Sequence, residues 1–509
     1  MRKIFRNKKI NPIMAITILI LITIVLSGIL NLAGFESTYY QLNESSGEYE
    51  AILIGVDSLF NLAGLKYIFS TTVSNFAAFT PLNMLIIVLI GIGIMEKSGF
   101  LKVFFTLLTK NSHKNSITFG LVFISMIMSL FGNIGYVIMI PISALLFQHG
   151  RRNPILGIVT SFAALTCGSG LSLFFTSTDS MMLVDTMIST SVFSKTELTT
   201  TIYLFIMPVA MILTSLLITF ITEKISVEKV AKYEFKEEKK EFKLARKEVR
   251  GLLYALIAGV IYLSLFIYQI IPNVPLGGNL LDNSQAFYID KLFSPNSFFN
   301  DGFVFIVTLF FIILGLFYGL GSKNIKTQND FFENIKHSLD GLGSTIVFIL
   351  FASVLINVFK RTNIGMVIIA QFADIMSNTT FTGIPLIIIL FLFGAVSTFF
   401  MPSSTARWKI MASAAVPTFM EAGLTAEFSQ LIFRVSEGVT MGLTPLLAYF
   451  VIYLAFVQKY NQEDDPITLG STMKYQIPYS MIIGIALIVI LILWYLSGLP
   501  LGIGGTTAL

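Results

Sequence analysis

Residues 399–405 read FFMPSST and lie in the middle of the apolar stretch 383–419. Proline has no backbone N–H and ends a helix, so this stretch cannot be one continuous helix. At membrane depth, an interrupted backbone is tolerated only where it is buried in protein or lines a cavity. We therefore predict that residues 383–419 form a re-entrant hairpin whose tip lies near Pro402.

A second apolar stretch, residues 116–149, is interrupted in the same way. Its middle reads SLFGNIG at 129–135, where glycine and asparagine weaken a helix. Basic residues flank both of its ends, which places both ends in the cytoplasm: Lys110, Lys114, Arg151 and Arg152. This stretch is predicted to be a re-entrant hairpin from the cytoplasmic face, and 383–419 one from the outer face.

The rest of the chain has the composition of a membrane protein. Of its 509 residues, 55% are hydrophobic and only 12% are charged, whereas soluble domains have roughly 25% charged residues. A helix needs about 20 apolar residues to cross the hydrocarbon core. Runs close to this length predict nine transmembrane helices, at 13–34, 81–97, 154–178, 200–221, 251–271, 302–321, 341–359, 431–456 and 477–497.

Lysine and arginine predict the orientation, because cytoplasmic loops are enriched in them. The segment 223–250 has ten basic residues, whereas 35–50 and 272–301 are mainly acidic. We expect a multi-pass protein of the cell (inner) membrane with a cytoplasmic N-terminus and a C-terminus outside. The predicted parts are a first half (1–222), the charged cytoplasmic loop 223–250, and a second half (251–509).

Several function classes find no support in the sequence. It has no GxxxxGK[ST] loop, no HExxH or CxxC motif, and a single cysteine, Cys167. These patterns would signal a nucleotide or metal site. The basic residues are not interleaved with aromatic ones, so no nucleic-acid partner is expected. We expect neither an enzyme nor a bound metal or organic cofactor.

Each hairpin is followed by an interrupted span. CGSG at 167–170 follows the first, with Asp179 after it, and GVTMGLTP at 438–445 follows the second. Two such units of opposite orientation indicate an inverted-repeat transporter, whose site lies between the repeats. The predicted fold is an all-α polytopic membrane protein with about nine transmembrane helices and two re-entrant hairpins. Their tips are expected to meet near the bilayer midplane.

Several short motifs of the sequence resemble those of the aminobenzoyl-glutamate transporter (AbgT) family. In the second half they are TGIPL (382–386), SSTARW (403–408), FRVSEGVT (433–440), FVQKYN (456–461) and LWYLSGLPLG (493–502), and in the first half EKSG (96–99), GYVIMIP (135–141) and STD (177–179). The resemblance implies a sodium- or proton-coupled transporter, a homodimer of protomers with nine spans and two hairpins. Family members are linked to aminobenzoyl-glutamate uptake and to export of sulfonamide antifolates.

The match of individual residues indicates a divergent member. Asp179, Trp408 and Arg434 are the same as the residues that the family has at these positions. At other positions the family's residue is replaced: an aspartate by Glu437, asparagines by Thr398 and Ser172, a proline by Ala426, and the aspartate of the first hairpin tip by Asn133.

Charged and aromatic residues near the interruptions are the first site candidates. An acid within a membrane is costly, so Asp179 is expected to bind a coupling cation or proton among neutral oxygens, with no competing base; otherwise it lies at the membrane surface. Arg434 can hold a substrate carboxylate, or form a structural salt bridge with Glu437 at i, i+3. Trp408 stacks on substrate or lies at the interface. Its neighbours Arg407 and Lys409 are expected to contact lipid headgroups.

Small polar residues cluster at all four interruptions. Substrate donors are expected among Ser403, Ser404, Thr405, Ser169 and Gly170, beside Trp408, Arg434 and Glu437. Oxygen ligands for a hard cation such as Na⁺ are expected among Ser172, Asn133, Thr398 and Thr440, beside Asp179. Serine and threonine also hold helices together, which is the alternative for any single one.

The sequence thus predicts a secondary transporter for a small organic anion, driven by Na⁺ or H⁺ through alternating access. An aminobenzoyl-glutamate-like aromatic or carboxylate compound is the expected substrate class. The alternative within transport is a proton-driven exporter of sulfonamide-type antimetabolites. From another class, a channel or a membrane-embedded hydrolase remains, for which Asp179 and Glu437 are the only candidate acid pair. Membrane lipid is the other expected partner.

Overall fold

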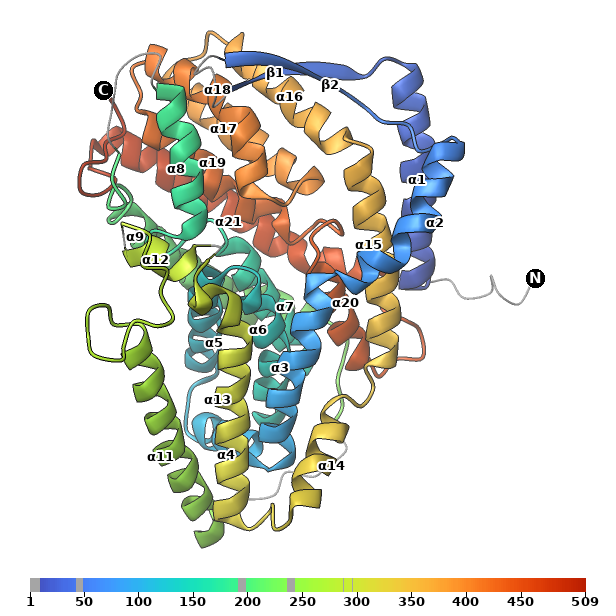
Figure 1. Ribbon diagram of the computed structural model, residues 1–509, viewed down its shortest axis with the longest axis vertical. Coiled ribbons are helices and arrows are strands. Elements are labelled where there is room, and N and C mark those ends of the chain that lie inside the picture. Colours follow the sequence, from blue (N-terminus) through green and yellow to red (C-terminus); the bar gives the residue numbers. More distant parts are fainter. Residues whose placement is uncertain (1–9, 43–48, 191–197, 236–242, 287, 295) are drawn as a thin grey trace.

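The computed structural model describes residues 10–42, 49–190, 198–235, 243–286, 288–294 and 296–509. These residues are mostly helical, as predicted, and also contain one antiparallel two-stranded sheet that was not predicted (Figure 1). The elements of the first half are α1 (Pro12–Leu32), β1 (Glu36–Leu42), β2 (Tyr49–Gly55), α2 (Leu62–Ala77), α3 (Thr80–Lys97), α4 (Phe100–Lys110), α5 (Lys114–Met128), a 3₁₀ turn (Ser129–Phe131), α6 (Ile134–His149), α7 (Pro154–Cys167), α8 (Ser177–Thr190), α9 (Ile206–Ile221), a π-helical turn (Thr222–Ser226) and α10 (Val227–Lys229).

The second half continues with helices alone. They are α11 (Arg246–Gln269), α12 (Tyr288–Phe293), α13 (Phe298–Ser322), α14 (Gln328–Ser338), α15 (Gly343–Arg361), α16 (Ile364–Ser377), α17 (Gly383–Phe400), α18 (Ser404–Glu421), α19 (Ala426–Met441), α20 (Phe450–Lys459) and α21 (Leu469–Ser497).

Nine helical segments in the described part of the chain are long and apolar enough to cross a membrane. Seven of them overlap predicted spans, although Leu62–Lys97 also includes α2, which was not predicted. The predicted spans 154–178 and 431–456 are each divided, as expected from their interruptions, into α7 and α8 and into α19 and α20. The other two long apolar segments are Lys114–Phe131 and Gly383–Phe400, the first arms of the two predicted hairpins. The chain is therefore a multi-pass membrane protein.

Both predicted hairpins consist of two helices joined by a short turn. In the first, Gly132 has φ +61°, a conformation that glycine adopts without steric cost. In the second, the helix stops at Phe400 and the next begins at Ser404, so that Met401, Pro402 and Ser403 form the tip. The breaks thus lie where the glycine and proline signals placed them. The path of these hairpins through the membrane stays a prediction.

The two interrupted spans cross each other between the hairpins. Gly170, in the break after α7, lies against the backbone of Arg434 in α19. Gly438 lies against Cys167, where an added Cβ would come within 2.7 Å of the Cys167 carbonyl oxygen. Glycine permits this close approach of two backbones because it has no side chain. We call this contact between the α7–α8 break and α19 the central crossing.

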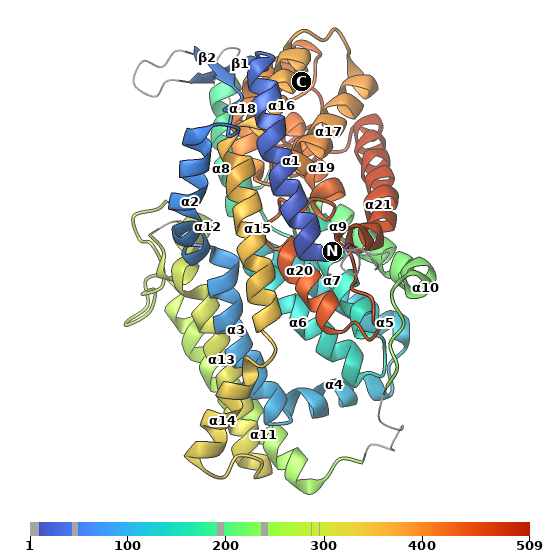
Figure 2. The same cartoon turned by 90° about the vertical axis from the view of Figure 1, so that its right-hand side faces the viewer.

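The hairpins pack on opposite sides of the central crossing. α5 and α6 contact α7, whereas α17 and α18 contact α19, and α18 also contacts α8. In Figure 1, α17, α18 and α8 lie in the upper part of the molecule, and α11 and α13 run side by side in the lower part. Figure 2 shows α1 beside α15 on another face.

Cysteine labelling tests the predicted orientation. Cys167 is buried, so introduced cysteines can be labelled over a low background. An impermeant maleimide is expected to label Asn283→Cys in intact cells and Lys232→Cys only after lysis, because 272–301 is predicted outside and 223–250 inside. Both native side chains are exposed. Equal labelling of Lys232→Cys before and after lysis would reverse the predicted topology.

Candidate functional site

Four charged side chains meet beside the central crossing. They are Asp179 at the start of α8, Arg407 in the first turn of α18, and Arg434 and Glu437 in α19. Their side chains are 1%, 0%, 7% and 1% exposed, respectively. We call them the buried charge cluster. Its two arginines and two carboxylates balance, so the cluster has no formal net charge.

Asp179 is held by one arginine and by its own helix start. Its Oδ1 accepts from Arg434 Nε at 3.0 Å. Its Oδ2 accepts from the Thr176 backbone N–H at 2.9 Å and from the Thr176 hydroxyl at 2.6 Å. The expectation that Asp179 has no competing base is therefore wrong. Its side chain is only 1% exposed, so Asp179 is buried within the protein and not at the protein surface.

Glu437 joins both arginines. Its Oε1 accepts from Arg434, as the i, i+3 spacing predicted. Its Oε2 accepts from Arg407 Nη2 at 3.1 Å and from the Ser404 hydroxyl. Ser404 and Arg407 are three residues apart at the start of α18, so they lie on the same helix face. The break at Pro402 sets the start of α18 and thus places this face against α19.

Arg407 is the residue that sequence reasoning misjudged. Contact with lipid headgroups was expected, but the side chain is fully buried. Its Nη1 donates to the Gly394 carbonyl at 3.1 Å and to the Ser397 hydroxyl at 3.2 Å in α17, while its Nε has no partner among the described residues. Arg407 thus ties the two arms of the second hairpin to Glu437. Lys409, two residues later, is exposed.

Trp408 is also fully buried, so it is not an interfacial tryptophan. Its indole N–H donates to the Thr186 hydroxyl at 2.9 Å, and that hydroxyl donates to Gln430 Oε1 at 2.6 Å. Gln430 in turn donates to the Asp179 backbone carbonyl at 3.2 Å. The indole ring packs on Phe433 with centroids 5.0 Å apart. This polar chain fastens α18 to α8 and α19 beside the buried charge cluster.

The sequence offered weak signals for these further residues. An arginine within an apolar membrane segment is a functional candidate by default. Arg407, in the second hairpin arm, is such a residue. Thr186 and Gln430 gave no local signal. Their positions depend on how α8 and α19 pack, and they are 244 residues apart in the chain.

The other predicted substrate residues lie close to the buried charge cluster but point elsewhere. Ser403 is exposed and Thr405 is half-buried at the second hairpin tip. Ser169, in the break after α7, donates to the Thr166 carbonyl of that helix at 2.8 Å. Gly170 takes part in the central crossing through its backbone. Of the neutral residues predicted to bind substrate, Ser404 is the one whose side chain hydrogen-bonds to the cluster.

The predicted ion-coupling residues divide into three places. Ser172 and Asp179 line one cavity of about 20 Å³, enough for about one water molecule. Thr398 and Thr440 donate to backbone carbonyls of α17, to Gly394 at 2.8 Å and to Ala395, respectively. Asn133 is exposed at the turn of the first hairpin. The structure therefore brings Ser172, but not Asn133, together with Asp179.

The family model described as the AbgT putative transporter family matches residues 4–509, nearly the whole chain. The chain belongs to the AbgT family. The curated p-aminobenzoyl-glutamate transport protein of Escherichia coli (strain K12) is 24% identical over 499 residues, which are 98% of this chain and 94% of that protein.

Two solved structures are similar to this AbgT chain. The YdaH transporter of Alcanivorax borkumensis is 24% identical, with 97% of this chain and 100% of that chain covered and a TM-score of 0.48. Neisseria gonorrhoeae MtrF, described as illuminating a class of antimetabolite efflux pumps, is 26% identical, with 96% of each chain covered and a TM-score of 0.49.

The balance of the buried charge cluster can be tested by stability. Arg407→Gln leaves one arginine against two buried carboxylates, an uncompensated charge of −1 in the cluster, so it is expected to destabilise the AbgT chain by about 3–5 kcal/mol. Combining it with Glu437→Gln restores the balance and is expected to recover part of the loss. Thermal unfolding of the purified protein in detergent measures both.

Arg361→Gln is the matched control for this series. Arg361 pairs with Asp57 at 2.5 Å, but its side chain is 49% exposed. Exposed pairs contribute only about 0–1 kcal/mol, so this change should have little effect. If Arg407→Gln and Arg361→Gln unfold at the same temperature, the stability of the fold does not depend on the charge balance of the buried charge cluster.

Proposed function

We propose that this AbgT transporter moves a small organic anion across the membrane, coupled to H⁺ or Na⁺, with p-aminobenzoyl-glutamate as the first substrate to test. The observation that supports it best is the neutral buried charge cluster beside two interrupted helices. Interrupted helices near the middle of an inverted repeat are where transporters bind solutes. The E. coli relative, a p-aminobenzoyl-glutamate transport protein by its description, supplies the substrate class.

Arg434 is the group best placed to bind the substrate carboxylate. It bridges Asp179 and Glu437 through Nε and Nη1. Among the described residues, nothing accepts from its second terminal nitrogen, Nη2, and the side chain is 7% exposed. A guanidinium binds carboxylates through such parallel N–H groups. Arg434 can therefore gain a substrate carboxylate while releasing one of its own.

Charge balance then explains coupling. A substrate carboxylate that joins the cluster makes its net charge −1, and an uncompensated charge in a low-dielectric site is costly. A proton or Na⁺ that binds Asp179 or Glu437 restores neutrality. The cavity of about 20 Å³ beside Asp179 and Ser172 offers room for one such cation. Cation and anion would thus bind together more tightly than either alone, which is the requirement for coupled transport.

The second hairpin is the element that would open the site. Its residues Ser404, Arg407 and Trp408 all contact α8 or α19. Trp408 has no exposed ring face here, so the hairpin must move before the indole can stack on an aromatic substrate. Movement of this arm on one side, and of the first hairpin on the other, would give the alternating access expected of an inverted repeat.

Asp179→Asn tests the coupling role. It removes the charge at nearly constant shape, so accumulation of labelled p-aminobenzoyl-glutamate against a gradient is expected to be lost in proteoliposomes. H⁺ and Na⁺ gradients imposed separately identify the driving ion, and reversing each gradient gives the direction of transport. Asp185→Asn is the control, because Asp185 is on the same helix and makes no ion pair among the described residues.

Three results would count against this proposal. Normal gradient dependence in Asp179→Asn would make Asp179 a structural residue only. Unchanged transport without either gradient would indicate a channel or uniporter. If the wild type accumulates none of a panel of organic anions but expels a sulfonamide, the exporter alternative replaces uptake.

Arg434→Lys tests the carboxylate contact. Lysine keeps the charge but loses the guanidinium fork, so the apparent KM for p-aminobenzoyl-glutamate should rise by roughly 10- to 100-fold, as expected for losing a charged hydrogen bond. An analogue with the carboxylates amidated should bind wild type and variant equally weakly. If the variant binds p-aminobenzoyl-glutamate and the amidated analogue more weakly to the same degree, Arg434 supports the fold and does not bind the substrate carboxylate.

A further inference from the structure

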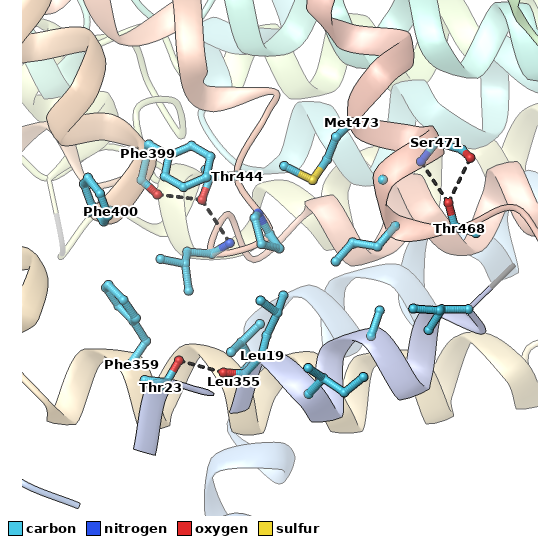
Figure 3. Close-up of a pocket in the computed structure, with 17 residues that line it drawn as sticks. Leu19, Thr23, Leu355, Phe359, Phe399, Phe400, Thr444, Thr468, Ser471 and Met473 are labelled. Carbon is cyan, nitrogen blue, oxygen red and sulfur yellow. Dashed lines mark hydrogen bonds between the residues drawn. The ribbon is translucent and has the colours of Figure 1, made fainter. Parts of the chain in front are cut away.

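A large cavity lies apart from the buried charge cluster, between α1 and α15 on one side and α17, α21 and the break before α20 on the other. Its volume is about 680 Å³. Figure 3 shows Leu19, Leu355 and Phe359 on one wall, facing Phe399, Phe400 and Met473 on the other. These side chains make the lining mainly apolar. No step of the proposed transport reaction uses this cavity.

The few polar side chains in the lining form hydrogen bonds with other groups on the same wall of the cavity. The Thr23 hydroxyl donates to the Leu19 carbonyl at 2.8 Å, and the Thr444 hydroxyl donates to the Phe399 carbonyl at 2.7 Å. The hydroxyls of Thr468 and Ser471 are 2.9 Å apart (Figure 3). Few donors are left for a polar anion, which would lose much of its hydration here. An apolar group therefore fits this cavity better than a polar anion.

The length of the cavity along α1 is close to the thickness of one membrane leaflet. It extends along α1 from Ala15 to Thr23, about 12 Å at 1.5 Å per residue. Half of the hydrocarbon core is about 15 Å thick. Ala15 lies near the start of α1, which is the predicted cytoplasmic end, and Thr23 lies near the middle of that helix. An acyl chain of the cytoplasmic leaflet thus fits the cavity in length as well as in polarity.

A second cavity, of about 510 Å³, adjoins the first at Ser471 and carries positive charge. It is lined by Lys229 and Lys474, both of which are exposed. Neither lysine makes an ion pair among the residues that the structure describes. Lys229 ends α10 and lies within the segment 223–250 that is predicted in the cytoplasm. Two lysines without an ion pair among the described residues, at the predicted cytoplasmic end of an apolar cavity, complement the phosphate of an anionic headgroup.

We propose that the two adjoining cavities bind one anionic phospholipid of the cytoplasmic leaflet, with an acyl chain between α1 and the second hairpin and the headgroup phosphate between Lys229 and Lys474. Phe399 and Phe400 end the first arm of this hairpin, so the acyl chain contacts the element that must move to open the transport site. Bound lipid is therefore placed to influence the rate of that movement. The site itself is independent of which anion is transported.

Native mass spectrometry of the purified full chain tests the site with phosphatidylglycerol and phosphatidylcholine. The wild type is expected to retain one phosphatidylglycerol per chain in preference to phosphatidylcholine. Each lysine near an anionic headgroup contributes about a fivefold preference. Lys229→Gln combined with Lys474→Gln should remove the preference while leaving weak binding of both lipids. Ala15→Trp fills the cavity and should reduce binding of both.

Two control variants separate this site from general lipid contact. Lys323→Gln with Lys326→Gln removes two exposed lysines elsewhere, and Val25→Trp adds the same ring on an exposed position of α1. Both should bind lipid like the wild type. Equal retention of the two lipids by the wild type, or equal losses in the test and control variants, would overturn the proposal. Full displacement of the lipid by millimolar glycerol phosphate would also overturn it, because the headgroup alone would then account for binding.

Discussion

The ion pairs of Arg434 with Asp179 and Glu437 are the constraint on which the central part of this protein depends. A guanidinium buried among apolar helices is tolerable only if its charge is compensated and its N–H groups are bonded. The two acids come from α8 and α19, so satisfying Arg434 fixes those helices relative to each other. The second carboxylate oxygen of Glu437 can then pair with another cationic group, and Arg407 of the second hairpin is that group.

The central crossing makes this arrangement sterically feasible. Interrupted spans leave backbone groups without helical partners, and here the breaks lie where protein surrounds them. The glycines at positions 170 and 438 let the α7–α8 break approach α19 closely enough for side chains of both to share one cluster. The second hairpin adds its own contacts from Ser404 and Trp408. The charged pairs and the close backbone contact therefore support each other.

The sequence predicted the interruptions well because proline and glycine act locally. The tip at Pro402 and the turn at Gly132 lie within the stretches named from composition alone. Long apolar runs likewise predicted spans that overlap seven of the nine long apolar segments found among the described residues. Pairings between distant residues were not accessible, since Asp179 and Arg434 are 255 positions apart and meet only after α8 packs on α19. The burial of Arg407 was missed for the same reason. The strands β1 and β2 were missed because their acidic segment was assigned to a loop.

The neutrality of the buried charge cluster also has an electrical consequence. Moving one elementary charge across a membrane potential of 100 mV involves about 2.3 kcal/mol. A cluster of two arginines and two carboxylates can change its depth or its access to either side without performing such work. For the coupled transport proposed above, the resting potential of the cell would then act little on the protein without bound solutes and mainly through the charges of the solutes that it binds. The ratio of those solutes would decide whether transport generates a current.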